Sequence, residues 1–258
     1  MPKMAERTWF FLCLTLGRLL RSARYSRVTI VREADECGVR KERAFYAPLL
    51  ITMSTPLMAA LDTGVSVLPR RRWFEREVRM YRELYGLPVA IDNDRTLVLP
   101  CHTGDTLAAL LENPKLPAPA RLKAIESAVV ALHRLHGSGF AHGDAMAENV
   151  MVDIDAGIAH WFDFETVHDR RRPLAWQRAD DVRALLGTCV IRFDTDRIPE
   201  VVKVFLDAYG DTEIMALVAK TFDSSWQRPL VFHLGQAPMS FDRFNLIGRT
   251  LREHRLTG

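Results

Sequence analysis

The sequence is poor in features that would place it in several protein classes. Only four of its 258 residues are cysteines, Cys13, Cys37, Cys101 and Cys189, and no two form a CxxC pair. This spacing predicts neither a disulfide framework nor a zinc site, and it favours a reducing compartment. The formal net charge of +3 is too small to indicate a nucleic-acid partner.

No apolar run near the N-terminus is long enough to cross a bilayer. The run at residues 9–16 is well short of the roughly 20 residues that a membrane-spanning helix needs. Bulky and basic residues follow it in place of a cleavage site, so we do not expect export. Two interpretations remain, a first strand or helix of the N-terminal part and an amphipathic segment on a membrane. We therefore expect a cytoplasmic protein, peripheral at the inner face of the membrane under the second interpretation.

The arginines are clustered, although the net charge is small. They form groups at residues 18–27, 70–76 and 170–172. Such groups can face phosphates or an anionic membrane surface, and they can equally be solvated faces.

The first hundred residues read as rich in strands. A β-prone run at 27–33, a turn at 35–38 and a strand from Val39 predict a hairpin. Apolar residues at spacings of three and four predict a helix over 72–85, which Gly86 ends. A short strand follows at 96–99. We expect the chain to divide near residues 100–104, into an N-terminal part, 1–100, and a C-terminal part, 101–258.

The C-terminal part reads as mainly helical. Pro119 opens a helix with apolar residues on one face, and Gly137 ends it. Three strand-like pieces follow, at 140–142, 150–152 and 158–162, with a turn at 153–157, and helical patterning resumes at Trp176. The order predicts an α+β protein.

The segment at residues 142–165 carries the chemistry. Mg²⁺ prefers hard oxygen ligands, and Asn149 and Asp163 can supply an amide oxygen and a carboxylate. Asp144 can orient a hydroxyl and accept its proton. The turn at 153–157 would bring Asn149 and Asp163 to the same end of a hairpin.

These residues resemble the protein-kinase signature, HxDxxxxN followed by a hairpin and DF. The residues that match are His142, Asp144, Asn149, Asp163 and Phe164. Gly143 and Glu165 stand where protein kinases usually carry arginine and glycine. The pattern is closer to the aminoglycoside phosphotransferases and other small-molecule kinases.

The resemblance implies a two-lobed protein-kinase-like fold, with a nucleotide-covering lobe before a catalytic lobe, and ATP with Mg²⁺ or Mn²⁺ as cofactors. It also implies a phosphate-binding lysine and a helical glutamate. Lys41 and Glu77 are the candidates, with Glu75 and Glu83 as alternatives for the glutamate. The arginine-rich insert before Glu77 resembles the kinases that phosphorylate Kdo or heptose in the lipopolysaccharide core.

Further positions follow from the same resemblance. The backbone of Leu99 and Cys101 would bind the adenine edge, and His142 would support the catalytic loop by packing. Asp181 would brace the backbone of that loop, with Asp180 as an equally placed alternative. The sequence has no GxGxxG motif, so the phosphate-covering loop would be degenerate or formed near Gly17 or Gly38.

The acceptor is not encoded in the motif. The resemblance favours transfer of the γ-phosphate to a hydroxyl of a small molecule or saccharide. The apolar run and the arginine groups add peripheral contact with an anionic membrane surface, and nucleic acid is not expected. The alternatives are a Ser/Thr protein kinase and a non-catalytic pseudokinase that binds without turnover.

Overall fold

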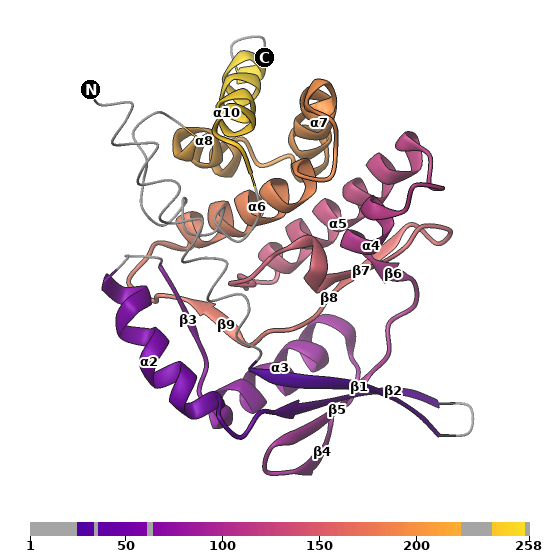
Figure 1. The fold of residues 1–258 in the computed structure, drawn as a ribbon, viewed down its shortest axis with the longest axis vertical. Helices are drawn as coiled ribbons and strands as arrows, with labels where there is room; N and C mark the ends of the chain where they lie inside the picture. Colours follow the sequence, from indigo (N-terminus) through magenta and orange to yellow (C-terminus); the bar gives the residue numbers. More distant parts are fainter. Residues whose placement is uncertain (1–24, 34–35, 61–63, 223–238, 256–258) are drawn as a thin grey trace.

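The computed structural model describes residues 25–33, 36–60, 64–222 and 239–255, and it has an α+β architecture. An N-terminal antiparallel sheet is followed by a mainly helical C-terminal region (Figure 1). The apolar run at 9–16 and Gly17 lie outside the described residues. Among those residues, no helix combines the length and the hydropathy needed to cross a bilayer.

The N-terminal sheet has the strand order β1-β2-β5-β4. Its strands are β1 (Ser26–Glu33), β2 (Glu36–Arg43), β4 (Ala90–Asn93) and β5 (Thr96–Pro100). The predicted hairpin is therefore confirmed as the β1–β2 pair. In the register, Val28 faces Lys41 and Lys41 faces Leu97. Because partners in antiparallel strands project to the same side, these three side chains share one face of the sheet.

Two helices accompany this sheet. Helix α3 (Arg70–Tyr85) confirms the helix predicted at 72–85, and Gly86 ends it in a left-handed conformation. Its buried face carries Trp73, Glu77, Met80 and Tyr81, so a glutamate lies in the middle of an otherwise apolar stripe. Helix α2 (Ala47–Ala60) was not predicted, because its residues are apolar on all sides and show no helical periodicity.

The C-terminal region consists mainly of helices, with a small sheet beside α4 and α5 (Figure 1). Strands β6 (Asp105–Thr106), β7 (Val150–Asp153) and β8 (Ile158–Trp161) form that sheet, and β3 (Val65–Val67) pairs with β9 (Thr166–His168). The helices are α4 (Leu107–Glu112), α5 (Ala118–Gly137), α6 (Leu174–Val190), α7 (Ile198–Tyr209), α8 (Thr212–Thr221) and α10 (Phe241–Arg255), with short 3₁₀ turns at Ala147–Asn149 and Thr195–Arg197. The strand expected at 140–142 does not form, and those residues are a loop.

One hydrophobic core joins the two regions. Its buried side chains run from Trp73 and Leu97, through Leu132 and Phe164, to residues of α6 to α10. The loop at 142–149 and the segment around Asp163 lie against this continuous core, which holds them in fixed positions.

A disulfide corrects the expectation drawn from the cysteines. Cys37, in β2, is bonded to Cys101, one residue after β5, with 5.5 Å between their Cα atoms. The amide of Cys101 also donates to the carbonyl of Cys37, so the two residues extend the strand pairing of β2 with β5. Residues 64 positions apart in the chain thus become neighbours, which spacing alone does not reveal. The cysteine-based argument for a reducing compartment no longer holds.

Candidate active site

A buried lysine lies at the centre of the candidate site. Lys41 Nζ is 2.6 Å from Glu77 Oε1, and these side chains are only 4% and 0% exposed. Trp73 Nε1 donates to the same Glu77 oxygen at 3.0 Å. A buried carboxylate is stabilised when it is paired and hydrogen-bonded, which explains why Glu77 can occupy the core-facing side of α3.

The same ammonium group reaches across to the C-terminal region. Lys41 Nζ donates to Asp163 Oδ1 in a short contact and lies 3.9 Å from Glu165 Oε2. Burial opposes the charge of Lys41, but attraction by Asp163, Glu77 and Glu165 outweighs it and raises the lysine pKa above its ordinary value. Lys41 is therefore a fixed positive charge between a helix of the N-terminal part and the segment after β8.

Asp163 has an unusual backbone. Its φ of 68° makes it the one non-glycine residue with positive φ in the described part of the chain. Aspartate tolerates the left-handed region better than most residues, and such strain is concentrated at functional sites. The amide of the preceding residue, Phe162, donates to the carbonyl of Asn149 at 3.0 Å. This bond ties the Asp163 segment to the loop that carries Asn149.

The catalytic-loop candidates contact one another. Asn149 Nδ2 donates to Asp144 Oδ2 at 2.9 Å and to the Asp144 carbonyl at 2.8 Å. With its nitrogen engaged, the amide oxygen of Asn149 is the atom left to bind a cation. The Asn149 oxygen and the Asp163 carboxylate are both hard donors, the kind that Mg²⁺ prefers. The described residues contain no cluster of three or more His, Cys, Asp or Glu able to hold a metal.

His142 supports the loop through both ring nitrogens. Its Nε2–H donates to the Phe162 carbonyl at 3.0 Å, and its Nδ1 accepts from the Asp144 amide at 3.2 Å. Only a neutral imidazole can do both. Burial lowers the His142 pKa to about 4, so the ring stays neutral over the physiological range.

The structure distinguishes between the two neighbouring aspartates of α6. Asp181 is buried and accepts from the amides of His142, at 2.6 Å, and Gly143, at 2.9 Å. Asp180 instead lies 3.1 Å from Nε2 of the buried His168. Burial alone would raise the Asp181 pKa, but interactions with His168 and His136, including the His136 hydrogen bond, lower it.

The hinge candidates lie at the end of β5. Leu99 is buried and faces Val39 in β2. The Cys101 amide is already engaged by the Cys37 carbonyl, which leaves the Cys101 carbonyl as the atom that could contact an adenine edge. Gly38 lies inside β2, opposite Pro100, and not in a loop.

Two arginines belong to the site, and sequence reasoning did not identify either role. Arg76 Nη2, on α3, donates to the Ala141 carbonyl at 2.7 Å, next to the catalytic loop. Arg43 Nη1 lies 2.7 Å from Glu165 Oε2. Arg43 lies two residues after Lys41 and therefore on the same face of β2, and this spacing could have indicated from the sequence that Arg43 lies near the site.

Comparison with known proteins adds no family to this geometry. The sequence matches no protein-family model and no curated protein. What this site can do therefore depends on the chemistry of its own residues.

Proposed function

We propose that the protein is a phosphotransferase that moves the γ-phosphate of Mg²⁺-bound ATP to a hydroxyl group. The observation that carries the proposal is the buried ammonium of Lys41, held by Glu77 at 2.6 Å and in contact with Asp163. A lysine held by a helical glutamate next to a metal-binding carboxylate is the arrangement that protein kinases use for phosphoryl transfer. On this proposal, the fold is a two-lobed protein-kinase-like fold.

The sheet face beside Lys41 supports nucleotide binding. Val28 and Ile30 of β1 project to the same face as Lys41, yet they are 62% and 64% exposed. Apolar side chains left open to solvent beside a buried cation fit a ligand with a flat apolar ring and an anionic tail. The base would lie against Val28 and Ile30, and the phosphates would extend toward Lys41.

The roles of the other residues follow from their contacts. Mg²⁺, held by Asn149 and Asp163, would neutralise charge on the phosphate oxygens. The Asp144 carboxylate, oriented by Asn149 Nδ2, would accept the proton of the acceptor hydroxyl. As the hydroxyl oxygen bonds to the γ-phosphorus, the bond to the oxygen bridging the β- and γ-phosphates breaks and ADP leaves.

The acceptor we favour is a small molecule or saccharide. Support comes from HGD and DFE in place of the protein-kinase residues, together with the arginine groups. A Ser/Thr protein kinase and a non-catalytic pseudokinase are the alternatives. The three differ in the molecule, if any, that receives the γ-phosphate of ATP.

A transfer assay with [γ-³²P]ATP tests the proposal. We expect label in the saccharide or small-molecule fraction, and a loss of about 10²–10⁴-fold in Asp144→Asn. Asp163→Asn should also lose activity, whereas Asp207→Asn, an exposed acid on α7, should not. Folding of each variant is checked by thermal unfolding.

The outcomes separate the classes. Label in added protein would indicate the protein kinase, and Mg²⁺-dependent ATP binding without transfer would indicate the pseudokinase. If the wild-type protein showed no affinity for Mg²⁺-bound ATP, or if Asp144→Asn and Asp163→Asn kept full transfer activity, the proposed site would be wrong.

A further inference from the structure

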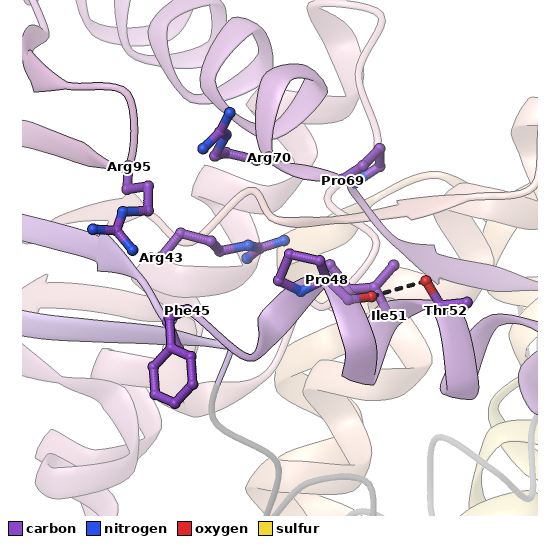
Figure 2. Close-up of a pocket in the computed structure, with 9 residues that line it drawn as sticks. Arg43, Phe45, Pro48, Ile51, Thr52, Pro69, Arg70 and Arg95 are labelled. Atoms are coloured by element: carbon purple, nitrogen blue, oxygen red, sulfur yellow. Dashed lines mark hydrogen bonds between the residues drawn. The ribbon is translucent and has the colours of Figure 1, made fainter.

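A cavity whose lining includes neither Asp144 nor Asn149 lies among the ends of four elements. Its volume is about 330 Å³, within the range of ligand pockets. The end of β2, the first turns of α2 and α3, and the start of β5 surround it (Figure 2). The residues that line it are Arg43, Ala44, Phe45, Pro48, Ile51, Thr52, Pro69, Arg70 and Arg95.

The cavity carries a concentration of positive charge. Arg43, Arg70 and Arg95 come from three different parts of the chain and border the same space (Figure 2). Helices α2 and α3 both begin at its wall, and neither has an acidic residue in its first turn. Helix N-termini carry exposed amides and partial positive charge, so both helices add to the attraction for an anion.

The nearby carboxylates offset only part of this charge. Asp94, itself 71% exposed, pairs with Arg70 at 2.7 Å and lies 4.0 Å from Arg95. Glu165 pairs with one nitrogen of Arg43. Three guanidinium groups therefore face two carboxylates, and neither carboxylate is among the residues that line the cavity.

Arg43 has a donor with no acceptor. The side chain is only 2% exposed. Its Nη1 donates to Glu165 and Ser26, and its Nη2 donates to the Leu68 carbonyl. Its Nε–H is buried and finds no hydrogen-bond partner in the part of the chain that the structure describes. An unpaired buried donor costs free energy, and an anion in the cavity could accept from it.

Apart from Thr52, the rest of the wall is apolar. Ile51, Pro48 and Pro69 contribute hydrocarbon surface, and Phe45 borders the cavity while 80% exposed. Leu49 and Met53, also on α2, are exposed as well. A ligand that combines a phosphate with an apolar group would use both kinds of surface.

We propose that this cavity binds a phosphate ester, with the phosphate held by Arg43, Arg70 and Arg95 and the apolar part against Phe45. Guanidinium groups match phosphate in geometry as well as charge. A soluble alkyl phosphate and the headgroup of an anionic lipid share this chemistry. Binding here does not depend on the proposed transfer of phosphate from ATP.

The first test measures binding by isothermal titration calorimetry. The probes are inorganic phosphate and butyl phosphate, with the nucleotide site saturated by Mg²⁺-bound ADP where the protein binds it. We expect one saturable site, tighter for butyl phosphate, and at least a tenfold loss of affinity in the double variant Arg70→Gln/Arg95→Gln. Phe45→Ser should remove the preference for butyl phosphate and leave phosphate binding unchanged.

The matched control removes the same number of charges from helix α3, outside the cavity. Arg71 and Arg82 are exposed on α3 and do not line the cavity, so Arg71→Gln/Arg82→Gln should bind like wild type. If both double variants lost the same affinity for the phosphate probes, the loss would reflect net charge and not this cavity, and the proposal would be overturned. The absence of saturable binding to the wild type would also overturn it.

A second arm separates the two ligand sources. Wild type and both double variants are co-sedimented with phosphatidylcholine vesicles, with and without phosphatidylglycerol. Binding to the anionic vesicles that is lost only in Arg70→Gln/Arg95→Gln identifies a lipid headgroup. Calorimetric binding without vesicle binding identifies a soluble phosphate ester.

Discussion

At the scale of single residues, Gly143 explains one departure from the protein-kinase pattern. Its φ is +91°, and a Cβ built on it would lie 2.6 Å from the carbonyl oxygen of Thr166. Its amide donates to Asp181 at 2.9 Å, which fixes the backbone in this position. The arginine found here in protein kinases would have no room, so the loop conformation itself requires glycine.

Gly143→Ala is expected to lower the free energy of unfolding by about 1–3 kcal/mol or more, because it adds a steric clash to an unfavourable φ. Gly139→Ala is the matched control, since Gly139 has a φ of +85° and a Cβ added there would meet no atom within 4 Å. Urea unfolding of the two variants isolates the clash. Equal losses would contradict the role assigned to Thr166.

The position of single residues on α3 also determines which glutamate pairs with Lys41. Glu75 and Glu83 were alternatives to Glu77, but both form exposed pairs with arginines one turn away on α3. Glu77 alone among the three lies on the buried face. Helical spacing excludes the others, because residues two and six positions from Glu77 project away from it.

At the scale of elements, the disulfide joins β2 to the end of β5. These are the strands that carry Lys41 and the hinge candidates. The link therefore holds the start of the lysine strand against the segment that leads into the C-terminal region. Because the two cysteines are 64 positions apart, the bond removes considerable freedom from the unfolded chain.

Replacing both cysteines, as Cys37→Ser/Cys101→Ser, should lower the free energy of unfolding by about 2–4 kcal/mol. Reductant should destabilise the wild type by a similar amount and leave the double variant unchanged. Denaturant unfolding with and without dithiothreitol measures both effects. A wild type whose stability is indifferent to reductant would contradict this account.

At the scale of the whole molecule, buried and half-buried histidines link the stability of the fold to pH. Burial lowers the pKa of His142 and of His102 to about 4, and it also lowers the pKa values of His160 and His168. In the unfolded chain the pKa of each of these histidines is about 6.5. Between these values the unfolded chain binds more protons than the folded one, so acidification favours unfolding.

The free energy of unfolding should therefore be highest above about pH 6.5 and fall as the pH drops toward 4. The shift of His142 alone corresponds to about 3 kcal/mol over this window. In His142→Asn the dependence should be correspondingly shallower, because one of the buried imidazoles is gone. Denaturant unfolding at several pH values in this range measures how the free energy of unfolding depends on pH. The same dependence in wild type and His142→Asn would contradict the assignment.

Local structure could be predicted from the order of the residues alone. The hairpin of β1 and β2 and helices α3 and α5 follow from turn residues and periodicity, which act over a few positions. Spacing alone brought forward the residues of the loop at 142–149 and Asp163 as candidates. The structure joins Asn149 to Asp144 by a side-chain hydrogen bond and to Phe162, next to Asp163, by a backbone hydrogen bond.

The meeting of distant residues depends on the packing of the complete chain. Lys41 contacts a carboxylate 36 residues away and another 122 residues away, and Cys37 meets Cys101 across two strands. The choice of Asp181 over Asp180, and the cavity around Arg43, depend on how helices and strands pack. Such contacts are set by burial and by strand register across the whole core, and no short stretch of sequence carries that information.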